Sequence, residues 1–326
     1  MEYAGEDVHI RATNDDAAVS RCSASKAGYF ADPFIPLFVK RAERRSPVIN
    51  RGSYCRFIGI QNVIQQFLRA CKQCDLSSQI VVLGSGSDTT YFLLKTDYAP
   101  TRFVEIDFPE ITSVKCMKLH RNSRLRSLLP EGCQTGRGGA ELYSDQYTIL
   151  AGDLRQFESD IVPRLLETGL RSDVPTLFLS ECVLIYLDPQ FSDRLIASVS
   201  QQWPSAFFVT YEQIQPHDAF GQMMTQNLQS RGLQLHSIAT YPDLESQRQR
   251  YLSLGWQQAN SKSIAQLHRE LPVSEIQRIN RLEFLDELEE FNLLGDHYCI
   301  TWSFQSSNSQ IINHWRNITP SHIGAS

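Results

Sequence analysis

Glycine and acidic residues recur along the chain, each group directly after a short apolar run. The groups are Gly84-Ser-Gly86-Ser-Asp88, Asp107, Gly152-Asp153-Leu154 and Ser180-Glu181-Cys182. Closely spaced glycines let the backbone turn sharply and approach a ligand. An acid at the end of the next strand, 23 positions after Gly84, can accept hydrogen bonds from both hydroxyl groups of a ribose. Together the four groups predict a pocket for an adenosine-containing cofactor.

Each acid also has a structural interpretation. Asp107 could cap the helix expected from Pro109, and Asp153 could cap the helix that follows it instead of contacting an adenine amino group. Glu181 could form a structural ion pair. Because Glu181 lies within an apolar run, where an unpaired charge is costly, a ligand contact is the favoured interpretation for this residue.

Two cofactors suit such a pocket. The third glycine of the dinucleotide fingerprint would fall at Thr89 and is missing, which weakens the case for a nicotinamide dinucleotide as the cofactor. S-adenosylmethionine has no phosphate, and its carboxylate, ammonium and sulfonium groups suit a basic residue together with acids, with Glu181 facing the cationic end. The residues favour S-adenosylmethionine and leave a nicotinamide-dependent oxidoreductase as the alternative.

The apolar runs predict the scaffold of this pocket. They lie at Ile80–Leu83, Arg102–Ile106, Tyr147–Leu150, Thr176–Leu179 and Ala206–Thr210, with helical stretches between them. This alternation predicts an α/β fold with a doubly wound, mostly parallel sheet. Two further strands, near Trp256 and at Tyr298–Phe304, would bring the sheet to seven. Ligands bind at the carboxyl ends of such strands, where the four groups stand.

The flanking segments predict four regions. Residues 1–20 are polar and lack periodicity, so we expect a mobile tail. Residues 21–77 are expected to be helical, and residues 26–56 hold seven Lys or Arg against Asp32 and Glu43. Residues 78–304 form the predicted catalytic domain, and residues 305–326 a second tail.

Composition excludes several classes of protein. The 326 residues carry 31 Lys and Arg against 36 Asp and Glu, a net charge of −5, which argues against a nucleic-acid-coating protein. The longest apolar run, 175–187, is too short to span a membrane, and no secretory signal is visible. Eight cysteines without such a signal indicate free thiols in the cytoplasm. The single Cys71-Lys-Gln-Cys74 is interpreted as structural, with no metal site expected.

The chain resembles the leucine carboxyl methyltransferase family through several segments. The most specific is Pro47-Val-Ile-Asn-Arg51-Gly52-Ser-Tyr-Cys-Arg56. The others are Ser25-Lys26-Ala-Gly-Tyr, Leu83-Gly84-Ser-Gly86-Ser-Asp88, Glu105-Ile-Asp107-Phe-Pro109, Ala151-Gly-Asp153-Leu154-Arg155, Glu181-Cys-Val-Leu-Ile-Tyr186 and Glu283-Phe-Leu-Asp286-Glu-Leu. The match runs from about Ser23 to Phe304. Gly-Ser-Gly stands where relatives more often have Gly-Ala-Gly or Gly-Cys-Gly.

The resemblance implies a function and a set of site residues. The fold would be of the S-adenosylmethionine-dependent methyltransferase type, with the N-terminal segment as a helical lid and further helices after the fifth strand. The reaction would esterify the C-terminal leucine of the protein phosphatase 2A catalytic subunit and so regulate holoenzyme assembly. Its cofactor residues would be Lys26 and Arg56 at the carboxylate end, Gly84 at the close approach, Asp107 at the ribose, Asp153 and Leu154 at the adenine, and Glu181.

The resemblance leaves alternatives open. Lys26 could be a solvated lysine, and Arg56 one charge on a basic helical face. A related group of carboxyl methyltransferases modifies a tRNA base and appends a β-propeller, of which this sequence has no repeat. The absence of such a repeat favours the phosphatase-directed branch, and a non-catalytic adapter is a further alternative.

The expected nucleophile is already charged. An α-carboxyl group titrates near roughly 3.3–3.7, so it is ionised at neutral pH and requires no general base. No histidine stands at any of the five strand ends. We therefore expect positioning and exclusion of water to accelerate the reaction, with Arg56 orienting the carboxylate.

Overall fold

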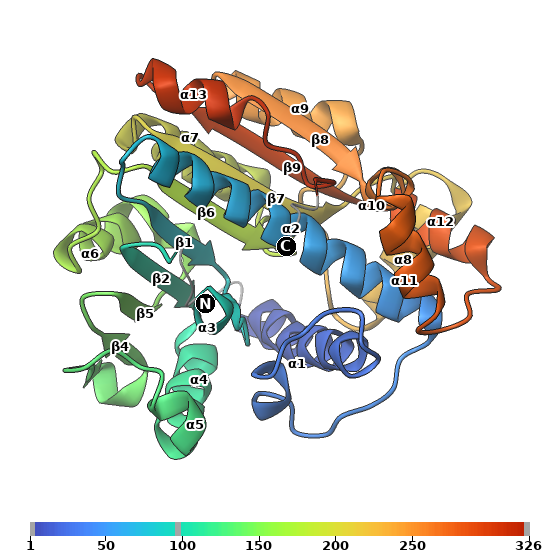
Figure 1. Ribbon diagram of the computed structural model, residues 1–326, viewed down its shortest axis with the longest axis horizontal. Helices are drawn as coiled ribbons and strands as arrows, with labels where there is room; N and C mark the ends of the chain where they lie inside the picture. The colour runs from blue at the N-terminus through green and yellow to red at the C-terminus, as the bar shows by residue number, and fades with distance from the viewer. Residues whose placement is uncertain (1–3, 95–98, 323–326) are drawn as a thin grey trace.

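Five parallel strands form the centre of the structure, a computed structural model that describes residues 4–94 and 99–322. They are β1 (Gln79–Leu83), β2 (Arg102–Asp107), β5 (Tyr147–Ala151), β6 (Thr176–Glu181) and β7 (Ala206–Gln213), in the order β5-β2-β1-β6-β7 (Figure 1). β9 (Tyr298–Gln305) pairs antiparallel with β7, and β8 (Gln258–Ser263) pairs antiparallel with β9. This arrangement confirms the doubly wound, mostly parallel sheet with its seven predicted strands.

A short hairpin adds two strands that the sequence did not predict. β3 (Gln134–Gly136) pairs with β4 (Glu141–Tyr143), which in turn pairs antiparallel with β5 at the edge of the sheet. Strands of three residues are too short to leave an alternation of apolar and polar residues in the sequence. The sheet therefore has nine strands within the described residues.

Alternate residues of the buried strands face two helical layers. Ile80 and Val82 of β1 belong to the cluster under α2 (Pro47–Gln73), α4 (Pro109–Arg121) and α13 (Ser309–Trp315). Val81 and Leu83 face the other layer, formed by α6 (Val162–Glu167), α7 (Pro189–Gln202) and α9 (Leu244–Ser253). Because both faces are covered, every residue of β1 is buried, which explains its continuous apolar sequence.

The remaining helices are shorter or lie beyond the sheet. α8 (Ala219–Ser230), α10 (Ile264–Arg269), α11 (Val273–Asn280) and α12 (Leu288–Asp296) gather at one end of the molecule (Figure 1). Single turns connect other elements: α3 (Thr90–Leu93), α5 (Ser123–Arg126), the 3-10 turns η1 (Ile35–Leu37), η2 (Arg137–Gly139), η3 (Leu154–Gln156) and η5 (Leu184–Tyr186), and the π-helical turn η4 (Phe157–Ile161).

The N-terminal region differs from the predicted mobile tail. Residues 4–20, expected to lack regular structure, belong to α1 (Ala4–Lys26), which lies beside the carboxyl ends of the strands (Figure 1). The first half of this helix makes ion pairs with residues distant in sequence, such as Asp7 with Arg155 at 2.8 Å. A helix held by distant charges shows no apolar stripe, and so its sequence resembled a tail. Residues 1–3 lie outside the described residues.

The predicted lid over 21–77 is also divided differently. α2 is a core layer, because Val63, Ile64 and Phe67 are completely buried against the sheet. It begins after Ser46 with Pro47 at its first position, where a fixed φ and a missing N–H suit a helix start. α1, which crosses the predicted boundary at residue 21, is the element of this region that covers the strand ends.

The predicted C-terminal tail is ordered over most of its length. β9 continues to Gln305, and α13 buries Trp315 completely, with its ring 5.5 Å from that of Phe67. The polar residues that suggested a tail form the cap and exposed face of a short helix: Asn308 accepts hydrogen bonds from the backbone of Gln310 and Ile311. Residues 323–326 lie outside the described residues. In the part of the chain that the structure describes, no helix has the length and apolarity that crossing a bilayer requires.

Candidate functional site

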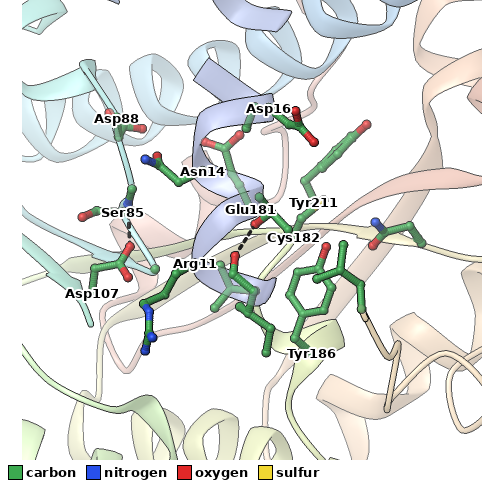
Figure 2. Close-up of a pocket in the computed structure, with 18 of the residues that line it drawn as sticks. Arg11, Asn14, Asp16, Ser85, Asp88, Asp107, Glu181, Cys182, Tyr186 and Tyr211 are labelled. Carbon is green, nitrogen blue, oxygen red and sulfur yellow. Dashed lines mark hydrogen bonds between the residues drawn. The ribbon is translucent and has the colours of Figure 1, made fainter. Parts of the chain in front are cut away.

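A cavity of about 430 Å³ opens at the carboxyl ends of the parallel strands (Figure 2). This is where the strand order reverses around β1, the usual ligand site of an open α/β sheet. The glycine turn and Asp107 lie on one side of the cavity, and Tyr186 and Tyr211 on the other, with Glu181 between them (Figure 2). α1 crosses in front, and eleven of its residues, between Glu6 and Arg21, line the cavity.

The structure brings six of the seven predicted site residues to this cavity. Its lining includes Arg56, Gly84, Asp107, Asp153, Leu154 and Glu181. The five that follow strands arrive there because parallel strands place their carboxyl ends at one edge of the sheet. Arg56 does not follow a strand and comes instead from α2, which precedes the sheet in the chain.

The turn after β1 requires glycine at two positions. Gly84 and Gly86 adopt positive φ values of 67° and 50°, where a side chain would be strained. A Cβ at Gly84 would come within 2.4 Å of Val183 Cγ2. The Ser85 hydroxyl is buried and has no hydrogen-bond partner among the described residues. A buried hydroxyl without a partner, flanked by two glycines, suits a polar ligand.

Asp107 fastens this turn to β2. One carboxylate oxygen accepts a hydrogen bond from Gly86 N at 2.6 Å and the other from Phe108 N at 2.7 Å. α4 has Phe108 as its N-cap and no side-chain cap, so Asp107 does not cap it. Burial raises the pKa of Asp107 to about 6, against the effect of these two N–H donors. A carboxylate in this state gains stability from further donors, such as the hydroxyls of a ribose.

Asp153 caps a turn, as its structural interpretation predicts, and it also lines the cavity. It caps η3 by accepting a hydrogen bond from Arg155 N at 2.9 Å, and it pairs with the Arg155 guanidinium. The same guanidinium reaches Asp7 of α1, so the adenine end predicted from Asp153 is bridged to α1. Leu154, 7% exposed, presents an apolar surface to the cavity.

Glu181 and Arg56 form an ion pair inside the cavity. Arg56 Nε donates to Glu181 Oε2 at 2.7 Å, and the guanidinium lies 4.7 Å from the centroid of the Tyr211 ring. Burial lowers the pKa of Arg56, but the charge and hydrogen bond of Glu181, together with Cys182 and Tyr211, raise it by more and the net shift is upward. The predicted structural alternative for Glu181 is thus observed, and it places a permanent cation at the site.

Lys26 does not reach the cavity. It is exposed at the last position of α1, while Arg21 on the same helix lines the cavity. Arg21 is held by Asp32 at 2.9 Å and by the Thr89 hydroxyl at 2.9 Å, and its guanidinium stacks over Phe57 at 4.9 Å. Five residues correspond to roughly 140° around a helix, so only one of the two can face the cavity. Arg21 is the basic residue that the motif around Lys26 failed to identify.

Other cavity residues also escaped the sequence analysis. Tyr298 stacks on Tyr211 with ring centroids 5.4 Å apart, and burial raises the pKa of Tyr298 to about 12. The phenol therefore stays neutral and can donate a hydrogen bond. His236 lines the cavity and lies 3.3 Å from Glu6 of α1. Their signal in the sequence was weak, because none of them follows a predicted strand end next to a glycine or an acid.

The lining suits binding and orientation rather than proton transfer. Burial raises the pKa of Cys182 to about 12, so this thiol is not a nucleophile at neutral pH. All eight cysteines are free. Among residues 4–94 and 99–322, no group of three or more His, Cys, Asp or Glu side chains is arranged to hold a metal ion.

The chain is similar to characterised proteins along most of its length. The model of a family described as leucine carboxyl methyltransferase matches residues 9–200. Leucine carboxyl methyltransferase 1 homolog of Arabidopsis thaliana is 39% identical over 300 residues, covering 90% of this chain and 88% of that protein. Leucine carboxyl methyltransferase 1 of Bos taurus is 36% identical over 307 residues, covering 91% and 90%.

A third relative has a different substrate in its name. The tRNA wybutosine-synthesizing protein 4 of Rattus norvegicus is 37% identical over 304 residues, which cover 89% of this chain and 43% of that protein. The relatives named for leucine carboxyl methylation are thus covered almost completely, and the tRNA-directed one over less than half. With the family model matching more than half of its residues, the chain belongs to the leucine carboxyl methyltransferase family.

Proposed function

We propose that this protein uses S-adenosylmethionine to methylate the C-terminal leucine α-carboxylate of the protein phosphatase 2A catalytic subunit. The observation that carries the proposal is family membership combined with a cavity that joins a glycine turn, a ribose-type acid and two arginines. The names of the relatives support the leucine carboxylate as acceptor. The family resemblance supplies the phosphatase.

The residues present fit S-adenosylmethionine. Gly84 lines the cavity and the unpartnered Ser85 hydroxyl offers a polar group for its amino-acid part. Asp107 would accept from its ribose, and Asp153 and Leu154 would border its adenine. Arg21 and Arg56 would hold its carboxylate, or that of the acceptor, and Glu181 its ammonium group. When bound, it supplies an electrophilic methyl group on a sulfonium ion.

A nicotinamide dinucleotide fits less well. Its pyrophosphate would bind at the N-terminus of the helix after the glycine turn. Here that helix is the single turn α3, and the buried carboxylate of Asp88 already accepts the hydrogen bond from its first residue, Thr90. A negative charge at this position repels a phosphate, so the local electrostatics disfavour the oxidoreductase alternative.

The chain's own contribution is to bind, orient and exclude water. The acceptor carboxylate is ionised at neutral pH, so Arg56 can hold it without taking or giving a proton. The neutral phenols of Tyr211 and Tyr298 and the apolar residues Phe291 and Leu294 line the same cavity. Good orientation of the reacting groups is worth about 7–11 kcal/mol, and removing water from a weak nucleophile adds to it.

The test is transfer of a labelled methyl group to defined acceptors. The protein is incubated with methyl-labelled S-adenosylmethionine and purified phosphatase core, and the product is treated with mild base. Label that mild base releases from the terminal leucine is the expected result. Phosphatase lacking its last residue is the matched control and should stay unlabelled.

Other outcomes identify the alternatives. Label on tRNA but not on the phosphatase would favour the acceptor named for the wybutosine relative. Binding of S-adenosylmethionine without transfer to either acceptor would favour a non-catalytic adapter. Calorimetric binding of NADH and not of S-adenosylmethionine would overturn the proposed cofactor and with it the reaction class.

A further inference from the structure

The segment after β6 forms the wall of the cavity that faces the glycine turn. Cys182, Val183, Tyr186 and Leu187 all line the cavity. Cys182 has φ of +54°, a left-handed conformation that costs a residue with a side chain about 1–3 kcal/mol. Val183 then rests directly against Gly84. A shift of this wall would therefore change the cavity at the glycine close approach.

Two residues outside the family motifs hold the wall in place. Ser237 Oγ donates to the carbonyl oxygens of Leu184 and Leu187, at 3.2 and 2.9 Å. Glu212, near the end of β7, binds a backbone N–H of the same segment: its Oε1 accepts from Leu184 N at 3.2 Å. The backbone N–H groups of Val183 and Ile185 oppose the upward shift of its pKa. The buried Glu212 side chain is thus fastened to the backbone of the wall at Leu184.

Glu212 is an acid that is buried without a full set of hydrogen-bond partners in the described part of the chain. The side chain is 2% exposed, and its Oε2 has no hydrogen-bond partner among the described residues. Arg250 is the cation that faces it, but the Arg250 guanidinium donates to Asp193 and Ser192 instead. A buried acid with one unpartnered oxygen is costly to the fold, which points to a functional reason.

We propose that Glu212 is a positioning residue for the bound methyl donor. Its buried carboxyl group accepts the hydrogen bond from Leu184 N and so sets the distance between the Val183 wall and the Gly84 turn. The inference rests on the proposed function, because it assumes that S-adenosylmethionine occupies this cavity. A glutamine cannot carry the charge that strengthens the hydrogen bond from Leu184 N, so the wall should loosen and S-adenosylmethionine should bind more weakly.

The titration of Glu212 gives the proposal a distinctive signature. Burial raises its pKa to about 8, while Arg250 and the three N–H groups oppose that shift. The other titratable groups that face it are Tyr251 on α9, Cys299 on β9, and Cys182 and Tyr186 on the wall. The charged form accepts the hydrogen bond from Leu184 N more strongly, so the affinity for S-adenosylmethionine should rise as pH increases through about 8.

Stability should change in the opposite direction. A carboxyl whose folded-state pKa is raised contributes stability that is fully present below its unfolded pKa and is lost as pH rises through the folded value. As pH rises from about 4.5 to about 8, burial of Glu212 therefore lowers the free energy of unfolding of the protein progressively. The neutral Glu212→Gln variant carries no such cost, so at pH 9 it should melt no lower than the wild type while binding the donor less tightly.

The experiment is calorimetric titration with S-adenosylmethionine at pH 7 and pH 9, with melting temperatures measured in parallel. The wild type should bind more tightly at pH 9 and release a proton on binding near pH 8. Glu212→Gln should bind about tenfold or more weakly at pH 9, with little dependence on pH. Thr210→Val is the matched control, because Thr210 is buried on the same face of β7 without contacting the wall. Its affinity should stay close to that of the wild type.

The possible failures are distinguishable. A wild type that does not bind S-adenosylmethionine would overturn the proposed function, and this inference with it. Wild-type binding with no proton release near pH 8, a result that needs no variant, would overturn the role of Glu212 alone. So would a Glu212→Gln variant that binds like the wild type, or one that loses affinity and melting temperature together as a merely structural residue would.

Discussion

Arg21 and Lys26 lie on one helix, but only the arginine meets the cavity. Asp32 and Thr89 hold the Arg21 side chain in one direction, whereas Lys26 is exposed at the helix end. A fixed guanidinium can bind a carboxylate through two parallel hydrogen bonds, and a solvated ammonium cannot. At the residue scale, the electrostatics of this site therefore depend on side-chain direction and not on charge count.

The first prediction contrasts these two residues. Arg21→Ala should weaken S-adenosylmethionine binding by about 2 kcal/mol, because a charge-assisted hydrogen bond is lost. Lys26→Ala is the matched control and should leave binding within about 0.5 kcal/mol of the wild type. Isothermal titration calorimetry measures both. If Lys26→Ala lost more binding affinity than Arg21→Ala, Lys26 and not Arg21 would be the basic residue that binds the cofactor.

The second prediction concerns pH and Asp107. Burial raises the pKa of Asp107 to about 6, so the stability that its protonated form contributes is lost as pH rises through about 6. Ribose hydroxyls bind the charged form, so S-adenosylmethionine affinity should fall as pH drops from 7 to 5. Asp107→Asn should bind weakly and remove most of this pH dependence. Equal pH profiles for the variant and the wild type would exclude Asp107 as the titrating group.

At the scale of elements, the first half of α1 covers the cavity and is attached through ion pairs and a hydrogen bond, whereas the second half packs Ala18, Cys22 and Ala24 into the core. Its contacts across the cavity include the pairs Asp7–Arg155, Arg11–Glu110 at 3.3 Å and Asp16–Arg231. Asn14 adds a hydrogen bond from Ser87 N at 2.7 Å, which ties the helix to the glycine turn. Partly exposed ion pairs are screened by salt, so this cover is easier to release than a helix with an apolar stripe.

The third prediction follows from that attachment. Raising the salt concentration from ~50 mM to ~500 mM should accelerate dissociation of bound S-adenosylmethionine several-fold, measured by stopped-flow competition. Asp16→Asn, which removes the pair with Arg231, should accelerate it at low salt. Asp173→Asn breaks a similarly exposed pair with Arg171 away from the cavity and serves as the control. Dissociation rates that do not respond to salt would contradict an electrostatic cover.

At the scale of the whole molecule, the end of the chain completes the core of the catalytic domain. α13 packs on α2, and the Trp315 ring contacts both Phe67 and Phe207, at 5.5 and 5.6 Å. The side chain is fully buried although it comes from a segment that is polar on average. Trp315 and Ile311, one helical turn apart and both fully buried, therefore bind an otherwise polar helix to the core.

The fourth prediction tests this anchor. Trp315→Ala should lower the free energy of unfolding by about 3–5 kcal/mol, because it leaves a cavity between two aromatic rings. Donor affinity per folded molecule should be unchanged, since α13 does not line the cavity. Trp315→Phe is the conservative control and should lose much less. Chemical denaturation measures all three proteins, and an unaltered unfolding midpoint for Trp315→Ala would show that the segment is not part of the core.

The sequence alone determined the sheet and much of the site. Continuous apolar runs predicted the five parallel strands because both faces of β1, β2, β5, β6 and β7 are covered. Once the strands are parallel, their ends meet at one edge, so Gly84, Asp107, Asp153, Leu154 and Glu181 had to converge. Arg56 followed from a motif shared with the family, and the structure places it against Glu181.

Only the tertiary structure decided which other residues join them. Arg21, His236 and Glu212 reach the cavity or its wall through contacts with residues 11 to 230 positions away in the chain. The first half of α1 is held by distant charges, and α13 is a short polar helix with two buried residues, Ile311 and Trp315, so neither has the long periodic pattern that marks a helix in a sequence. Local periodicity records which side chains are buried within an element, whereas partners distant in the chain are selected only when the elements pack.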